Sequence, residues 1–339
     1  MAETRAMAVT ALQETERAAP RWSRPSFSTV ARSVTVATVL VVLLGAVVRI
    51  TGSGAGCGQH WPTCNGEVAH LPQRLETWIE LSHRTTSGLD FLGVLGLALF
   101  GFTLRPRHPA RLAAFAALAL MLLEIAIGAR LVLLNLVGSN MSLDRVVVMP
   151  AHLVTTSLLI GALSAASYFS AATRLDRQPQ LSKVDAARLK GALYWVVGAG
   201  LFLLLVSMTG AITALGDTVY PVRGQGALEH LQNDQAVGAH LLGKLRVVHP
   251  LLALLGVAGV WIGVSRAREA SAARAVQRLG AGLYAGGALA LLIGVTNVWL
   301  GAPGYVQVVH LGMACGLWLG IVVLAAMLWD LRTRVSEVS

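Results

Sequence analysis

The sequence predicts an all-α integral membrane protein with eight transmembrane helices, arranged as two pseudo-repeated four-helix bundles. The 339 residues are 55% hydrophobic and only 13% charged, with a mean hydropathy of +0.64. Soluble domains are about 25% charged. The apolar runs have the length of about 20 residues that crosses a bilayer. Histidines also recur within these runs at a spacing that indicates an internal repeat.

The apolar runs predict both the spans and their orientation. We place the spans near residues 31–50, 80–104, 112–135, 148–172, 191–213, 247–265, 279–300 and 305–329. An even number returns the chain to its starting side, where 19 of the 27 Lys and Arg residues fall. The positive-inside rule assigns that side to the cytoplasm. We therefore expect a multi-pass protein of the cell membrane with cytoplasmic termini, in contact with lipid and not with nucleic acid.

The first elements are a tail and a helix. Residues 1–30 are polar and unpatterned, so we expect a disordered cytoplasmic tail. The span 31–50 follows basic residues, as the apolar part of a signal peptide does. No clear A-x-A cleavage site follows it, and the repeat includes this helix, so we interpret it as a transmembrane helix.

The first outer loop, "GSGAGCGQHWPTCNG", contains two cysteines. Cys57 and Cys64 are seven positions apart among Gly and Pro residues that permit tight turns. The outer side is oxidising, which favours a disulfide over a free pair. A redox role for the pair is an alternative. Cys315, inside the last span, reads as a small buried hydrophobic residue.

The second span opens with Glu80, His83 and Arg84. Ionisable groups in a membrane are costly and mark functional sites by default. Glu80 precedes His83 by three positions, so both lie on one helical face. The alternative is that Glu80 caps the helix start. Asp90 and Glu124, within the second and third spans, suit either proton transfer or packing, and we leave both out of the site.

The chain then repeats. "LLGAVVRITGSG" resembles "VSMTGAITALGD" with Gly45 on Gly210, and "IAIGARLVLLN" resembles "LLIGVTNVWLG" with Gly128 on Gly294. This divides the chain into an N-terminal half (31–172), a cytoplasmic linker (173–190), a C-terminal half (191–330) and a cytoplasmic tail (331–339).

Each even-numbered span carries one histidine near its outer start, and no odd-numbered span carries any. These residues are His83, His152, His249 and His310. Imidazole commonly ligates haem iron, and facing helices can hold a haem between them. We predict two haem sites toward the outer side, one for each consecutive pair. Zinc would need further ligands, and a proton relay would not need such symmetry.

Three arginines at the outer membrane boundary, Arg49, Arg84 and Arg246, are candidate anchors for haem propionates. The alternative is that their side chains extend to the membrane surface and bind nothing. The sequence favours neither.

Five stretches resemble the haem A synthase family: "GAVVRITGSGAGCGQHWPTCNG", "ELSHRTTSG", "PAHLVTTSLLIG", "RVVHPLLALL" and "VVHLGMACGLWLG". The resemblance covers roughly residues 30–330. It implies an oxidoreductase that converts the C8 methyl group of haem O to the formyl group of haem A for terminal oxidases. The reaction would proceed by oxygen-dependent hydroxylation to a gem-diol that loses water.

The resemblance also assigns roles to residues. His83 and His152 would hold the substrate haem O, and His249 and His310 a resident haem b. Glu80 would be the catalytic carboxylate. Arg246 occupies the matching position of the second half, so only one half has the acid.

Implied partners are an electron donor that the sequence does not identify, haem O synthase and terminal oxidase assembly factors. Some family members carry a second cysteine pair in the outer loop of the C-terminal half, whereas residues 216–240 contain none. Two other classes of protein also fit four intramembrane histidines. One is a di-haem b electron carrier, which would leave its haem unchanged. The other is an eight-helix transporter.

Overall fold

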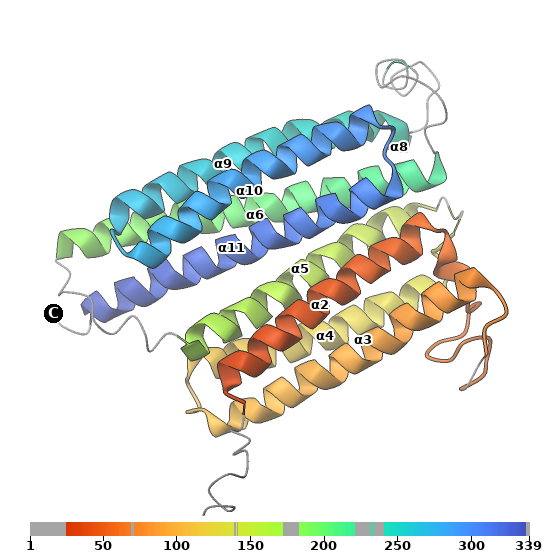
Figure 1. Ribbon diagram of the computed structural model, residues 1–339, viewed down its shortest axis with the longest axis horizontal. Coiled ribbons are helices and arrows are strands. Elements are labelled where there is room, and N and C mark those ends of the chain that lie inside the picture. The colour runs from red at the N-terminus through yellow and green to blue at the C-terminus, as the bar shows by residue number, and fades with distance from the viewer. Residues whose placement is uncertain are drawn as a thin grey trace, which may run out of the picture.

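The computed structural model of the chain is a bundle of long helices (Figure 1). It describes residues 25–68, 71–138, 140, 142–171, 183–220, 232 and 241–336. These residues contain eight helices that are long and apolar enough to cross a membrane, and no β-strand. The predicted all-α membrane fold is confirmed. Most of the expected tail 1–30, part of the linker 173–190 and residues 337–339 lie outside the described residues.

The helices follow the predicted spans in order. They are α2 (Phe27–Ile50), α3 (Leu75–Phe100), α4 (Pro109–Leu133), α5 (Leu143–Ala171), α6 (Lys183–Val219), α9 (Val248–Ala270), α10 (Arg274–Trp299) and α11 (Gly304–Ser336). Four short helices adjoin them: η1 (Ser53–Ala55), η2 (Gly101–Thr103), α8 (Leu241–Lys244) and η4 (Leu245–Val247).

Two helices run past their expected ends. α6 begins at Lys183, within the expected linker, and α11 extends to Ser336, within the expected tail. Both extensions are rich in Lys and Arg, whose long side chains can reach water while the backbone stays helical. The length of an apolar run indicates where the helix leaves the hydrocarbon core of the bilayer. The helix itself can continue beyond that point.

Side chains fix where two of the helices begin. The Ser26 hydroxyl oxygen accepts a hydrogen bond from the Thr29 amide at 3.2 Å at the start of α2. His108 does the same for α4, where its Nδ1 accepts from the Ala110 amide at 3.2 Å and Pro109 follows as the first helical residue. Both are common ways to satisfy amides that lack an intrahelical partner.

The long helices form two groups, and each group has its own apolar core. One core joins α2, α3, α4 and α5 through residues such as Leu97, Ala114 and Leu159, and the other joins α6, α9, α10 and α11 through residues such as Val260 and Leu324. Figure 1 shows the groups side by side. That they are repeats of one another stays a prediction.

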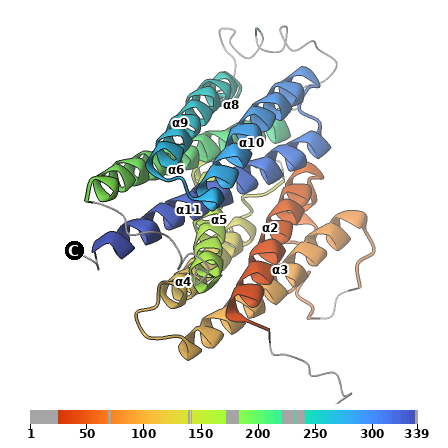
Figure 2. The ribbon, with the colours of Figure 1, turned by 60° about the vertical axis from the view of Figure 1, so that its left-hand side comes forward.

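The groups meet where α5 and α2 contact α11 and α6 (Figure 2). The indole N–H of Trp318 in α11 donates to the Ser157 carbonyl in α5. Gly161 makes room for this indole, because a Cβ atom there would lie 3.0 Å from its Nε1. The two groups therefore share an interlocked boundary.

Candidate functional site

The four predicted histidines lie at similar depth near one end of the bundle. Their helices cross the membrane from Leu75, Leu143, Leu242 and Gly304, and His83, His152, His249 and His310 come 8, 9, 7 and 6 residues later. At about 1.5 Å per helical residue, these depths differ by only about 5 Å. We call this end, on the right in Figure 1, the histidine end.

In the second group, His249 and His310 face each other with ring centroids 6.3 Å apart and ring planes at 86°. Two imidazoles on opposite sides of one iron place their centroids about 6 Å apart, since each metal–nitrogen bond is about 2 Å. Nδ1 of His249 lies 3.2 Å from the Val206 carbonyl oxygen and from the Thr209 hydroxyl. A proton on Nδ1 that is donated to this carbonyl leaves Nε2 free for a metal.

In the first group, His83 lies on α3 and His152 on α5. Nδ1 of His83 is buried and has no hydrogen-bond partner in the described structure. Nδ1 of His152 lies 3.0 Å from Oε1 of Glu124 on α4, without the alignment of a hydrogen bond. The Thr156 hydroxyl donates to the same oxygen. A carboxylate beside a ligand histidine orients its ring.

The structure therefore brings His249 and His310 together, whereas the pairing of His83 with His152 and the role of all four histidines as iron ligands stay predictions. No three His, Cys, Asp or Glu side chains of the described ranges converge as a metal site. Each pair offers two nitrogen ligands, the number that a haem iron takes when both axial positions are filled by protein. The paired rings therefore fit a haem.

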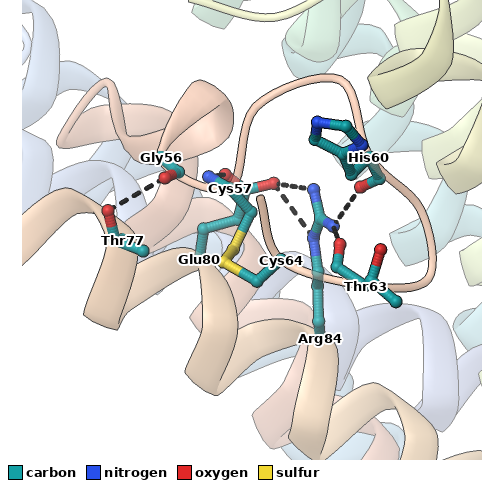
Figure 3. The surroundings of a disulfide bond; sticks show 8 residues. All are labelled: Gly56, Cys57, His60, Thr63, Cys64, Thr77, Glu80 and Arg84. Atoms are coloured by element: carbon teal, nitrogen blue, oxygen red, sulfur yellow. Dashed lines mark hydrogen bonds and ion pairs between the residues drawn. A yellow bond between two sulfur atoms is a disulfide. The ribbon is translucent and has the colours of Figure 1, made fainter. Parts of the chain in front are cut away.

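Glu80 lies beneath the first loop, with 3% of its surface exposed (Figure 3). Its Oε2 accepts a hydrogen bond from the Cys57 amide at 2.8 Å, and its Oε1 accepts from Nε of Arg84 at 3.1 Å. Arg84 also donates to the carbonyls of His60 at 2.6 Å and Thr63 at 2.7 Å. The carboxylate and the guanidinium together fasten the loop to α3.

The alternative role of Glu80 as a helix cap does not fit this geometry. α3 begins at Leu75, and the acidic residue of its first turn is Glu76. Stabilisation by the helix dipole is confined to that turn. Glu80 comes one turn later and binds the loop instead.

The loop itself contains the predicted disulfide, which is confirmed. Cys57 and Cys64 are joined at an S–S distance of 2.02 Å. The Thr77 hydroxyl donates to the Gly56 carbonyl at 2.9 Å. A Cβ atom at Gly56 would lie 2.6 Å from the Glu76 carbonyl oxygen, so only glycine lets the loop backbone approach α3 this closely.

Arg246, like Arg84, is buried at the histidine end. Its Nε lies 3.0 Å from Oδ1 of Asp217, and its Nη2 donates to the Tyr220 carbonyl at 2.6 Å. The side chains of Arg84 and Arg246 are only 11% and 6% exposed. Both guanidinium groups therefore bind oxygens of the protein itself, while binding of propionates stays a prediction.

Arg49 connects the two groups. From the last turn of α2 it donates to the Ala214 carbonyl and the Thr218 hydroxyl of α6, both at 2.9 Å, and to Oε1 of Gln307 in α11 at 2.6 Å. Gln307 is one helical turn before His310. Arg49 therefore belongs to the first group of helices by sequence but bonds to the second.

Other buried polar residues bond to neighbouring groups of the protein. Asp90 accepts a hydrogen bond from the Thr38 hydroxyl at 3.0 Å. Arg145, 3% exposed, donates to the carbonyls of Gly138 at 2.6 Å and Asn140 at 2.8 Å and holds the loop before α5. The contacts of Arg145 could not be predicted from the sequence. Glu124 was visible as an intramembrane acid, and only its distance to His152 connects it to the site.

Residues 29–322 match the family model described as "Cytochrome oxidase assembly protein". This range includes all four histidines, Glu80 and the disulfide. The match therefore extends over both groups of helices.

Curated relatives carry two different names. A "Protoheme IX farnesyltransferase" of Thermus thermophilus is 43% identical over 316 residues, which are 90% of this chain and 48% of that protein. A "Heme A synthase" of an Exiguobacterium species is 32% identical over 190 residues, 55% of this chain and 57% of that protein. Another "Heme A synthase", from Bacillus mycoides, is 59% identical over 56 residues, 16% of this chain and 18% of that protein. The chain spans about half the length of the Thermus relative.

Proposed function

Because the chain belongs to the cytochrome oxidase assembly protein family, we propose that it is a haem A synthase, a membrane oxidoreductase that converts the C8 methyl group of haem O to the formyl group of haem A. The observation that carries the proposal is the family match across both histidine pairs. Named haem A synthases among its relatives support it. The product would supply terminal oxidases.

The two sites have unequal roles in this proposal. His83 and His152 hold haem O, and His249 and His310 hold a resident haem b. When bound, haem iron supplies the redox chemistry. The 6.3 Å spacing of the second pair supports ligation there.

Two differences between the halves support unequal roles. Glu80 accompanies the first pair, and Arg246 stands at the matching position of the second. Glu124 lies beside His152, whereas the residue 166 positions later, the offset from Gly128 to Gly294, is Ala290. Both carboxylates therefore accompany the proposed substrate site, where protons leave the methyl carbon during oxidation.

Glu80 is the proposed catalytic carboxylate, which accepts or relays these protons. In the structure it is paired with Arg84 and the Cys57 amide. The ion pair with Arg84 holds the carboxylate in one position. To accept a proton, Glu80 would have to release Arg84. Arg84 lies close enough to Glu80 to anchor a propionate from the same place.

We place the protein in the cell membrane with both termini cytoplasmic and the histidine end outward. Basic residues at the opposite end of the described helices, among them Arg105, Arg107 and Arg266, support this orientation. The proposed partners are an electron donor, haem O synthase and terminal oxidase assembly factors. Haem O, which carries a long apolar tail, would arrive from the lipid.

The test is extraction and chromatography of haems from the purified full chain, expressed with and without a supply of haem O. We expect hydroxylated and formyl haems only with haem O, together with haem b in both preparations. Haem b alone, with haem O neither bound nor changed, would instead identify an electron carrier. Well-folded protein without any haem would favour a transporter and overturn the proposal.

Because the Thermus relatives are named farnesyltransferases, a second experiment tests for that activity. Purified protein is incubated with haem b and farnesyl diphosphate. A haem A synthase leaves both unchanged. Formation of haem O would show that this chain is the farnesyltransferase and not the oxidase that we propose.

A further inference from the structure

We propose that four glycines, Gly45, Gly128, Gly210 and Gly294, are positioning residues that let each histidine ring pack directly against the backbone of a neighbouring helix. We call this contact a glycine seat. Each glycine lies on the long helix directly before that of its histidine. α2, α4, α6 and α10 carry the glycines, and α3, α5, α9 and α11 carry the histidines. The inference rests on the proposed haem ligation, because it concerns the orientation of the ligands.

The evidence for this contact is the distance from each glycine position to the histidine ring. The distance from an added Cβ atom to the nearest histidine atom, Cε1 in every case, is 3.1 Å from Gly45 to His83, 3.7 Å from Gly128 to His152, 3.0 Å from Gly210 to His249 and 3.2 Å from Gly294 to His310. Carbon atoms in good contact are about 3.5–4.0 Å apart. At three of the four positions, alanine would therefore push the ring.

A histidine ligand needs such a contact. The torsion that rotates its ring, χ2, has broad minima, so the rotamer alone does not fix the ring plane. Cε1 lies between the two ring nitrogens, and pressure on it moves Nδ1 and Nε2 together. Close backbone on one side therefore limits how the ring can turn toward a haem.

Some other glycines of these helices also pack closely, such as Gly280 against Arg268 and Gly287 against Trp261, but others have no neighbour. Added Cβ atoms at Gly198 in α6, at Gly282 in α10 and at Gly88 and Gly96 in α3 would meet nothing within 4 Å. In the described helices, all four intramembrane histidines rest on a glycine. The glycines are also the ones whose sequence contexts align between the halves.

The contact at Gly128 is the loosest of the four. Its histidine, His152, is the one with a carboxylate 3.0 Å from Nδ1. At that site Glu124 shares the task of orienting the ring. We therefore expect Gly128→Ala to be the mildest of the four alanine variants.

The experiment uses the purified full chain with its resident haem b. Gly210→Ala and Gly294→Ala are compared with Gly198→Ala on α6 and Gly282→Ala on α10. The readouts are the g values of the oxidised haem in electron paramagnetic resonance, its midpoint potential and its dissociation constant. We expect the first two variants to shift the g values and the potential and to weaken haem binding about 10-fold, as loss of ligand support typically does. The two controls should match the unsubstituted protein.

If Gly210→Ala and Gly294→Ala match their controls in all three readouts, the inference is wrong. If a glycine variant is unstable, a double-mutant cycle with His249→Ala shows whether the histidine ring causes the instability. The measurement is thermal unfolding of the haem-free proteins. Removal of the ring should relieve the destabilisation by Gly210→Ala, and equal destabilisation in both backgrounds would also overturn the inference. Because this cycle needs no haem, it separates failure of the glycine seat from failure of the proposed function.

Discussion

At the scale of single residues, the strongest prediction concerns Glu80. Glu80→Gln should lower the conversion of haem O by about 100-fold or more, because proton transfer by a positioned carboxylate typically contributes this much. Haem content should not change, since both histidine pairs are intact. The measurement is the yield of hydroxylated and formyl haem per bound haem.

Glu80 also fastens the loop, so the loop needs its own control. Thr77→Ala removes the 2.9 Å hydrogen bond to the Gly56 carbonyl and leaves the carboxylate in place. Glu76→Gln removes a more exposed acid one turn earlier. Both controls should retain activity. Equal loss in Thr77→Ala would mean that Glu80 acts by holding the loop, and full activity in Glu80→Gln would remove its catalytic role.

A second prediction at this scale concerns Glu124. Glu124→Gln should weaken haem O binding about 10-fold, because the amide lacks the charge that orients His152. Haem b should be retained, since His249 and His310 belong to the other group of helices. Titration of haem O, followed by absorbance, measures the difference. Asp90→Asn, which changes an intramembrane acid bonded to Thr38, is the control, and an equal loss there would contradict a specific role.

At the scale of elements, Arg49 joins α2 to α6 and α11. Arg49→Ala should lower the free energy of unfolding by about 1–3 kcal/mol, because it removes the donor of a charged hydrogen bond to Oε1 of Gln307 and two further hydrogen bonds to α6. Arg49→Lys should lie between, since an ammonium lacks the planar fork that reaches several acceptors. Thermal unfolding in one detergent gives the ranking.

Arg266→Ala serves as the reference for Arg49, because the Arg266 side chain is 57% exposed and pairs only with Glu269 on its own helix. Exposed pairs of this kind contribute about 0–1 kcal/mol. If Arg49→Ala were no more destabilised than this reference, the contact between the groups would not stabilise the protein.

The helices could be predicted from sequence because bilayer thickness sets their length. All eight spans are present, and the errors lie at ends such as that of α11, where basic residues continue the helix. The order of the histidines along the chain also predicted that His249 and His310 face each other. The depth of a residue in the membrane follows from counting residues along its helix. The spans and the histidine positions can therefore be predicted from the sequence alone.

The partners of the polar side chains could not be predicted in the same way. Whether Glu124 faces His152 or lipid depends on the rotation of α4 about its axis, and the apolar residues of α4 are spread around the whole helix. Arg49 reaches the second group because α2 packs against α11, and nothing in the sequence of either helix requires this. Glu80 was placed on the correct helix face, but its loop partners depend on how residues 52–66 fold back.

At the scale of the whole molecule, the orientation in the membrane can be tested with cysteines. Cys57 and Cys64 form a disulfide and Cys315 is buried, so new cysteines report alone. One variant is Val68→Cys, at a residue of the first loop that is 95% exposed. The other is Arg107→Cys, at an exposed residue of the opposite end. A membrane-impermeant maleimide should label only the first in intact cells, because the histidine end faces outward. The reverse pattern would show that the histidine end faces the cytoplasm.

The contact of α2 with α11 has a consequence for biogenesis. The hydrogen bond from Arg49 to Gln307 joins residues 258 positions apart, the first long helix to the last. Helices enter the membrane in the order of translation, so this hydrogen bond cannot form until α11 has been synthesised. Contacts between distant residues also form slowly. Until then the Arg49 guanidinium lacks its acceptor in α11, so assembly of the two groups of helices completes a set of hydrogen bonds that α2 cannot complete alone.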